Sequence, residues 1–162
     1  MRALVTGCNR GIGLELAKQL KARGDEVLAV CRQSSEALDA LSVEVVSGVD
    51  VSKRDAVEKI AAALNGRTLD ALVHNAGVMR PDGLSGVAAD DVRFQLEVNA
   101  IAPVMLTQAL LPHLAEGAKV GIVTSRMGSI ADNGSGGMYG YRMSKAAVIA
   151  AGVSLARVLQ SN

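Results

Sequence analysis

A tyrosine and a lysine stand four residues apart in the segment Tyr141-Arg142-Met143-Ser144-Lys145 of this 162-residue chain. Positions i and i+4 of a helix share one face, so the phenol and the ammonium are expected to point the same way. A phenol with a pKa near ~10 is a poor proton shuttle at neutral pH, and a value of about 7 requires roughly 4 kcal/mol of preference for the phenolate. A nearby ammonium acts in that direction. The pair is a candidate for general acid and base catalysis, although Tyr-x-x-x-Lys alone often arises by chance.

A glycine-rich segment lies near the other end of the chain, Thr6-Gly7-Cys8-Asn9-Arg10-Gly11-Ile12-Gly13, directly after an apolar run. Glycine lets the backbone turn tightly and approach a pyrophosphate. The free N–H groups and the positive dipole end of the following helix then face the anion. In the first strand–helix turn of an alternating chain this pattern predicts a dinucleotide site. Its candidate contacts are Gly7, Asn9, Arg10, Gly11, Ile12 and Gly13.

The residue that follows the second strand usually distinguishes NAD from NADP sites. A ribose 2′-hydroxyl is bound by a carboxylate, whereas a 2′-phosphate is bound by cations. Here the strand ends in Val30-Cys31-Arg32, and no acid follows until Glu36. Arg10, inside the glycine turn, is a second cation for the same phosphate. Two guanidiniums and no carboxylate favour NADP, while the alternative for each arginine is a solvated surface charge.

Two further cofactor candidates follow later strands, at the edge of the sheet where nucleotides bind in parallel folds. Asp50, followed by Val51, is expected either to accept a hydrogen bond from the adenine amino group or to be a turn residue before a helix cap at Ser52. Asn75-Ala76-Gly77 follows the fourth strand, where small residues leave room for the cofactor.

Short β-branched runs alternate with helical patterns, which predicts βαβ units and a parallel sheet covered by helices on both faces. The expected strands are Arg2–Thr6, Glu26–Val30, Val43–Val46, Leu69–His74 and Lys119–Thr124. The expected helices are Gly11–Ala22, a short piece near Ser35–Leu41, one opened by Ser52 and closed by Gly66, a run from about Asp90 to Ala115 interrupted at Pro103, and about Tyr141–Leu159. The expected fold class is α/β, a single Rossmann-type domain with a doubly wound, three-layer parallel sheet.

The composition is typical of a globular protein, with 49% hydrophobic residues, 20% charged residues and a formal net charge of +1. No basic run points to nucleic acid or to an anionic membrane surface. No segment approaches the roughly 18 uninterrupted apolar residues of a membrane span. Two cysteines fit a reduced compartment, and no Cys/His spacing suggests a metal site. We therefore expect a cytoplasmic protein that binds a small molecule and no metal, nucleic acid or membrane.

Together these motifs resemble the short-chain dehydrogenase/reductase family. The matching pieces fall in family order and are TGCNRGIG at 6–13, Asp50-Val51, Asn75-Ala76-Gly77, Asn99, Ser125 and YRMSK at 141–145. The resemblance implies an NADP-dependent oxidoreductase that moves hydride between the nicotinamide and a carbonyl or alcohol substrate. It implies Tyr141 as the general acid and base, and Lys145 as the residue that favours the ionised phenol and binds the nicotinamide ribose. It also implies Ser125 as the donor that orients the substrate oxygen, and Asn99 as the holder of a water in the proton relay.

The sequence gives Asn99 separate support through Pro103. Proline has no N–H and cannot bond the carbonyl of the residue four positions earlier in a helix. We therefore expect a free carbonyl at residue 99 beside a kink, which is a candidate water site. The alternative is a helix that simply tolerates a proline kink.

Three features depart from the family pattern. His74 stands where the family commonly has Asn, and we expect a hydrogen-bonded core residue there rather than a catalyst. The segment between Ser125 and Tyr141 is longer than usual, as in the carbonyl-reductase and C-signal-like branch, so Ser129 is an alternative to Ser125. Family members also continue beyond residue 162, so we expect a longer physical molecule, with Lys119–Thr124 as an exposed apolar edge in this chain.

Two other readings stay open. A non-catalytic regulator would bind NADP and use its occupancy to control contacts with another protein, and an inactive fragment would follow if the chain ended at Asn162. The helices around 90–115 and 141–159 are rich in alanine and other apolar residues, which allows close helix–helix approach. A homodimer or homotetramer through these helices is expected, as the resemblance also implies.

Overall fold

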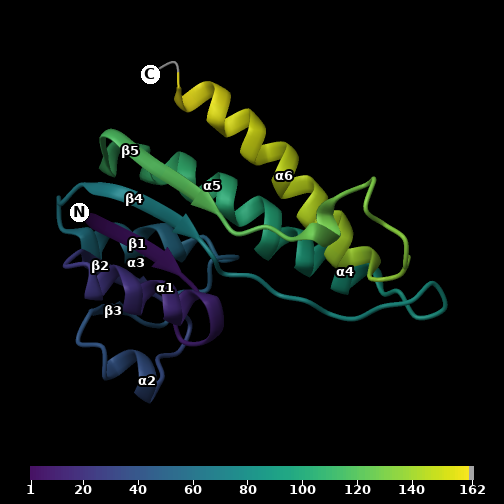
Figure 1. The fold of residues 1–162 in the computed structure, drawn as a ribbon, viewed down its shortest axis with the longest axis horizontal. Helices are drawn as coiled ribbons and strands as arrows, with labels where there is room; N and C mark the ends of the chain where they lie inside the picture. Colours follow the sequence, from purple (N-terminus) through teal and green to yellow (C-terminus); the bar gives the residue numbers. More distant parts are fainter. Residues whose placement is uncertain (161–162) are drawn as a thin grey trace. The chain divides into compact units, whose positions relative to one another are not determined.

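The computed structural model describes residues 1–160, and the chain divides into two compact units. Unit 1 comprises Met1–Ala76 and Leu106–Val123, and unit 2 comprises Gly77–Met105 and the chain from Thr124 onward. The helices, labelled in Figure 1, are α1 (Gly11–Ala22), α2 (Glu36–Asp39), α3 (Asp55–Leu64), α4 (Ala89–Leu96), the π-helix η1 (Glu97–Ile101), α5 (Ala102–Leu110), the 3₁₀-helices η2 (Leu111–His113) and η3 (Arg126–Gly128), and α6 (Tyr139–Leu159).

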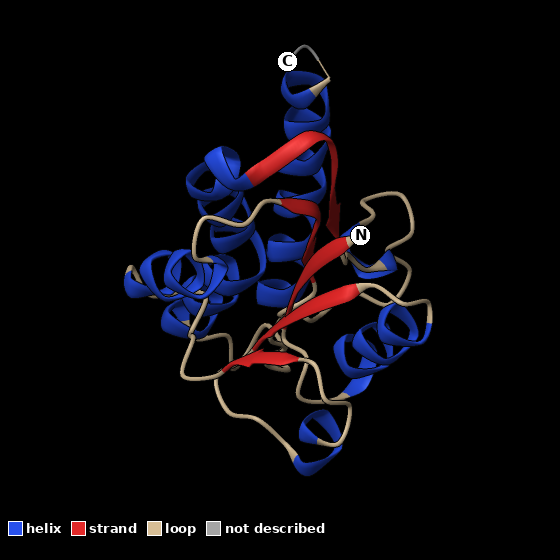
Figure 2. Cartoon of the chain, turned by 90° about the vertical axis from the view of Figure 1, so that its left-hand side faces the viewer, coloured by secondary structure: helices blue, strands red, loops and turns tan. Residues whose placement is uncertain are grey.

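Unit 1 contains a parallel sheet of five strands in the order β3-β2-β1-β4-β5, drawn in red in Figure 2. The strands are β1 (Arg2–Thr6), β2 (Glu26–Val30), β3 (Glu44–Val46), β4 (Leu69–His74) and β5 (Leu114–Ile122). From the central β1 the chain first builds outward through β2 and β3, and then returns to the other side of β1 with β4 and β5. The strand order therefore reverses beside β1. Ligands of open α/β sheets bind in the crevice that such a reversal leaves at the carboxyl ends of the strands.

Each face of the sheet has its own apolar core, because successive residues of a strand point to opposite faces. Leu4, Leu28 and Leu72 pack with α3 and with the C-terminal part of α5. Val5 and Ala29 pack on the other face with α1 and α2. Helices thus cover both faces within unit 1, and the predicted doubly wound, three-layer α/β fold is confirmed.

Two predicted element boundaries are wrong. Ser52 does not open α3, because its N–H and hydroxyl both donate to Asp50 Oδ1, at 3.0 and 2.7 Å, and the helix begins at Asp55. The predicted helical run extends to about Ala115 and the predicted strand is Lys119–Thr124, yet β5 starts at Leu114 and ends at Ile122. Pro112 lies in the 3₁₀ turn η2, and an irregular register with β4 includes Gly117 at a φ of 74°. Pairing with β4 overrides the local helical pattern.

The helical run that contains Pro103 is interrupted by a π-helical turn, η1, before the proline. In η1 the N–H of Ala102 donates to the carbonyl of Glu97, five residues earlier. A π-helical turn inside an α-helix occurs frequently at functional sites. The interruption precedes the proline and contains Asn99.

This run, Ala89–His113, is long and apolar enough to cross a membrane by length and composition alone. Half of the most apolar 18-residue stretch of this run is buried inside the protein. The run also contains the buried polar side chains Gln95, Asn99 and Thr107. These features are typical of a core helix that packs within a globular protein.

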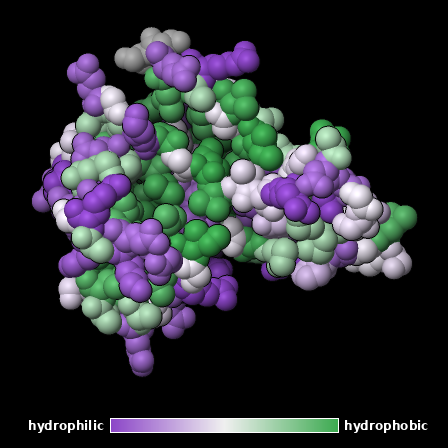
Figure 3. Space-filling view, viewed as in Figure 1, coloured by the Kyte–Doolittle hydropathy of each residue, from purple (hydrophilic) through white to green (hydrophobic). Residues whose placement is uncertain are grey.

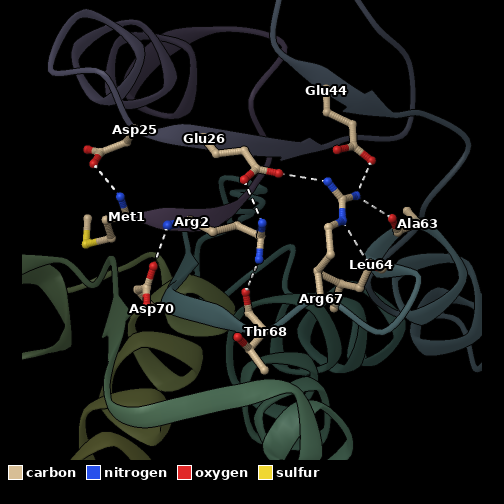
Figure 4. Close-up of polar contacts among 10 residues, drawn as sticks. All are labelled: Met1, Arg2, Asp25, Glu26, Glu44, Ala63, Leu64, Arg67, Thr68 and Asp70. Atoms are coloured by element: carbon tan, nitrogen blue, oxygen red, sulfur yellow. Dashed lines mark hydrogen bonds and ion pairs between the residues drawn. The ribbon is translucent and has the colours of Figure 1, made fainter.

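A charged network joins the amino ends of the strands, at the edge of the sheet opposite the glycine-rich turn (Figure 4). Arg67 lies between Glu26 and Glu44, with N···O distances of 2.7 and 2.8 Å, and it also donates to the last carbonyls of α3. Arg2 pairs with Glu26 at 2.7 Å and donates to the carbonyl of Thr68. The network ties β1, β2 and β3 to the end of α3.

Candidate active site

The glycines of the first strand–helix turn have distinct steric roles. A Cβ added at Gly13 would lie 2.2 Å from the Gly7 carbonyl oxygen, and one added at Gly7 would lie 2.8 Å from Ala76 Cα. Both distances are shorter than real Cβ contacts, so any larger residue would displace the turn. Gly11 has open space around it but adopts a φ of 58°, in the left-handed region that glycine tolerates best.

The N-terminus of α1 follows this turn and has the features of an anion site. Its first turn contains no acidic residue, and the N-cap residue Arg10 makes no side-chain cap hydrogen bond. Arg10, Gly11 and Ile12 are exposed. A helix of 12 residues presents free N–H groups and a positive dipole end here. Together with the close approach at Gly7 and Gly13, this geometry fits the pyrophosphate of a dinucleotide.

Asn75 holds the glycine turn in place through hydrogen bonds. From the sequence we expect only that this residue leaves room for the cofactor. Its Nδ2 donates to the carbonyls of Thr6 and Gly7, at 2.9 and 3.0 Å. The Thr6 hydroxyl in turn accepts from the N–H groups of Asn75 and Ala76, at 3.1 and 3.0 Å. The contacts span about 70 residues of sequence, so no local pattern could have revealed them.

The loop after β2 is attached to the same turn. Ser35 Oγ donates to the carbonyl of Asn9 at 2.8 Å. Arg32 is exposed at the end of the strand. Burial disfavours ionisation of Asp50, but hydrogen bonds from Ser52 and the nearby charge of Arg32 outweigh it and lower the pKa of the carboxyl. The turn role predicted for Asp50 is therefore present, beside one of the two predicted phosphate cations, and an adenine contact stays a prediction.

In unit 2, α6 brings the tyrosine and the lysine onto one face, as the i, i+4 spacing predicts. Lys145 Nζ lies 5.8 Å from the centroid of the Tyr141 ring. The lysine is only 5% exposed, and burial lowers the pKa of its ammonium. Tyr141 is partly exposed. The tyrosine and the lysine thus lie together as the spacing predicts, and their catalytic role stays a prediction.

The side chain of Asn99 is fully engaged in hydrogen bonds. Its Oδ1 accepts from the N–H of Val78 at 2.8 Å, and its Nδ2 donates to the carbonyl of Val78 at 2.8 Å and to Ser144 Oγ at 2.9 Å. Asn99 is 2% exposed. Both amide hydrogens of Asn99 are therefore taken, and a water held by the main-chain carbonyl of residue 99 stays a prediction.

Ser125 and Ser129 both accept hydrogen bonds from nearby amides. Ser125 Oγ accepts from the N–H of Met127 at 3.1 Å and caps η3, and Ser129 Oγ accepts from the N–H of Asp132 at 3.2 Å. A Cβ added at Gly128 would lie 2.8 Å from the backbone carbon of Lys145. The short helix between the two serines thus packs on α6 beside the lysine, and the choice between the serines stays open.

Three other polar or reactive residues are packed into the core. His74 is 3% exposed, with Nε2 at 2.8 Å from Thr107 Oγ1, and burial lowers the pKa of its imidazole to about 4. This confirms a hydrogen-bonded core histidine. Burial raises the pKa of the Cys8 thiol to about 12, and burial also raises that of Cys31. Both thiols fill the α1 side of the core.

Within residues 1–160, no cluster of three His, Cys, Asp or Glu side chains has a geometry that could hold a metal ion.

The predicted site residues gather in two groups, one in each unit. The group in unit 1 contains Gly7, Asn9, Arg10, Gly11, Ile12, Gly13, Arg32, Asp50, Val51, Asn75 and Ala76. The group in unit 2 contains Gly77, Asn99, Ser125, Tyr141 and Lys145.

Known proteins are similar to this chain in sequence. The chain is 46% identical to 1-hydroxy-2-glutathionyl-2-methyl-3-butene dehydrogenase of Rhodococcus sp. (strain AD45) over 153 residues, which are 93% of this chain and 68% of that protein. It is 46% identical to the C-signal protein of Myxococcus xanthus over 86 residues, 49% of this chain and 50% of that one.

A solved carbonyl reductase from Pseudomonas aeruginosa PAO1, in complex with NADP, superposes with a TM-score of 0.86 at 33% identity. The superposition covers 94% of this chain and 74% of the reductase. The family profile described as short chain dehydrogenase matches residues 1–162. With the glycine turn and the Tyr-x-x-x-Lys helix in place, the chain belongs to the short-chain dehydrogenase family of oxidoreductases.

Proposed function

We propose that this chain carries an NADP-dependent oxidoreductase that interconverts a carbonyl compound and an alcohol, with Tyr141 as the general acid and base. The observation that carries the proposal is the buried Lys145 ammonium, 5.8 Å from the Tyr141 ring on the same face of α6. This spacing brings the lysine amino group close to the phenol that would exchange the proton. A protein that only sensed the cofactor would have no need of such a pair.

Each group of residues would have its own role in this reaction. The N–H groups at the start of α1 bind the pyrophosphate, and the bound cofactor supplies or accepts the hydride. In the reductive direction Tyr141 Oη gives its proton to the substrate oxygen. Ser125 Oγ, or alternatively Ser129 Oγ, donates a hydrogen bond that orients this oxygen. Lys145 would bind the nicotinamide ribose, and the main-chain carbonyl of Asn99 would hold a water through which the proton is replaced.

The first test is NADPH oxidation over a panel of carbonyl compounds, using wild type, Tyr141→Phe and Tyr139→Phe. We expect Tyr141→Phe to lower kcat by about 10²-fold or more, the usual contribution of a general acid. Tyr139, the other tyrosine, begins the same helix and is the matched control, with an expected change of less than about twofold. Equal turnover by wild type and Tyr141→Phe would refute the assigned role.

The preference for NADP rests on Arg10 and Arg32. Both arginines are exposed near the first turn, and no carboxylate follows β2 until Glu36. Arg32→Ala is expected to weaken NADPH binding by about tenfold, since hydrogen bonds to a charged group contribute about 1.5–3 kcal/mol, and to leave NADH binding unchanged. Fluorescence titration measures both dissociation constants, with the exposed Lys18→Ala as the control. Tighter binding of NADH than of NADPH by the wild type would contradict the preference.

The substrate class proposed is a small carbonyl or alcohol compound. The name of the Rhodococcus relative describes a dehydrogenase acting on a hydroxy compound that bears a glutathionyl group, so alcohols with a thioether neighbour belong in the panel. A cytoplasmic location is proposed with this function. The likeness to the C-signal protein favours a second candidate, an NADP-binding signalling role, which predicts cofactor binding without turnover.

A homodimer or homotetramer is proposed as the working form. Large apolar side chains are exposed along α6, including Met143, Val153 and Val158 at 50%, 53% and 61%. Figure 3 shows hydrophobic surface along the course that α6 takes in Figure 1. An exposed apolar helix face of this kind marks an interaction surface.

A further inference from the structure

Residues 78–88, which precede α4, contain neither helix nor strand. Two side-chain amides nevertheless bind the backbone of this segment at alternate residues, Val78 and Arg80. Asn99 binds both the N–H and the carbonyl of Val78, at 2.8 Å each. Gln95, one helical turn earlier, does the same to Arg80, at 2.9 and 3.4 Å. Gln95 and Asn99 are 0% and 2% exposed. The two amides therefore act on this extended segment as a neighbouring β-strand would.

Asp82, the next alternate residue, binds the start of α6. Its main-chain carbonyl accepts from the N–H of Met138 at 3.0 Å, and its carboxylate accepts from the N–H groups of Tyr139 and Gly140, at 2.5 and 3.0 Å. The helix has no side-chain cap of its own, because its N-cap residue Met138 is left-handed, with a φ of 54°, and makes no cap hydrogen bond. Asp82 therefore satisfies the first N–H groups of α6 from a distant part of the chain.

The first turn of α6 fits closely against these groups. A Cβ added at Gly140 would lie 2.4 Å from Gln95 Nε2 and 3.2 Å from Asp82 Oδ2. On the other side of Tyr141, Ser144 Oγ donates to the Tyr141 carbonyl at 2.8 Å and accepts from Asn99 at 2.9 Å. The backbone of Tyr141 is thus held just before and just after the residue.

We propose that Asp82 is a positioning residue for Tyr141, fixing the first turn of α6 on a segment that the amides of Gln95 and Asn99 hold in place. The inference rests on the proposed role of Tyr141. Asp82 does not touch the reacting atoms and acts through the helix. A misplacement of a reacting group by about 1 Å costs on the order of 10²-fold in rate, so loosening this turn lowers kcat rather than cofactor affinity.

The experiment compares wild type, Asp82→Ala, Asp82→Asn and Asp90→Ala in two measurements on the full chain. Asp90, in the first turn of α4, is the matched control, because its side chain is 96% exposed and pairs with Arg93, a residue of the same helix. We expect Asp82→Ala to lower kcat by about tenfold or more with the NADPH dissociation constant unchanged. Asp82→Asn keeps one of the two acceptor oxygens and is expected to lose less of kcat than Asp82→Ala.

The second measurement is hydrogen exchange of the amides of residues 138–141 in NADPH-bound protein without substrate. We expect faster exchange in Asp82→Ala than in wild type, Asp90→Ala or Asp82→Asn. Unchanged exchange in that variant would overturn the inference whatever the activity, and so would an equal loss of kcat in Asp82→Asn and Asp82→Ala. Failure of the proposed function is seen separately, as equal turnover by wild type and Tyr141→Phe. If Asp82→Ala does not fold, Asp82→Leu, which also lacks an acceptor, replaces it in both measurements, and exchange as slow as in wild type overturns the inference in the same way.

Discussion

His74 shows how a single buried side chain makes stability depend on pH. Burial lowers the pKa of its imidazole from 6.5 to about 4, so the folded state holds the neutral form. Between these two values the unfolded chain binds more protons than the folded chain. The stability that the neutral ring contributes is therefore complete above pH 6.5 and is lost as the pH falls toward 4.

His74→Asn is expected to remove this acid sensitivity. Between pH 7 and pH 5 the free energy of unfolding of wild type should fall by about 2 kcal/mol more than that of the variant, because only wild type has the shifted histidine. Urea unfolding at the two pH values measures both free energies. His113→Asn, at a partly exposed position, is the control. The same pH dependence in wild type and His74→Asn would show that another group causes it.

At the scale of elements, the sequence predicts best those segments whose ends are marked by glycine or by a change of periodicity. The bounds of β1, α1, β2 and β4 agree with the prediction. In β5, residues from Leu114 onward have a helical pattern but pair with β4. At the start of α3, Ser52 has the residue type of a cap but donates to Asp50 instead. In both places a contact outside the local pattern decides the structure.

The same distinction between local pattern and distant contact applies to the residues of the candidate site. Positions set by local spacing, such as Tyr141 with Lys145 and the three glycines of the turn, could be identified from the sequence. Roles that depend on distant partners could not: the sequence marks Asn75 as a candidate but not its hydrogen bonds to the turn, and it does not mark Asp82 at all. Asp82 caps a helix 57 residues later in the chain, and Asn75 holds a turn 69 residues earlier. Both are short polar side chains that sequence reasoning assigns to loops by default.

At the scale of the molecule, the two edges of the sheet in unit 1 serve different purposes. The carboxyl ends of β1, β2 and β4 lead into the glycine turn, Arg32 and Asn75, which form the predicted cofactor site. The amino ends lead into the charged network around Arg67 (Figure 4), which links three strands and the end of α3. Stability and cofactor binding should therefore be separable by mutation.

Arg67→Ala tests this separation. The change removes two ion pairs and the hydrogen bonds to the last carbonyls of α3, and the side chain is only 33% exposed. We expect Tm to fall by roughly 5 °C, with the NADPH dissociation constant at low temperature within about twofold of wild type. Lys18→Ala is the control, since Lys18 is 64% exposed and pairs with Glu15 at 3.8 Å across one helical turn. Weaker NADPH binding by Arg67→Ala at an unchanged Tm would mean that the two edges are coupled through the sheet, because only a shift of the strands could carry the effect from one end to the other.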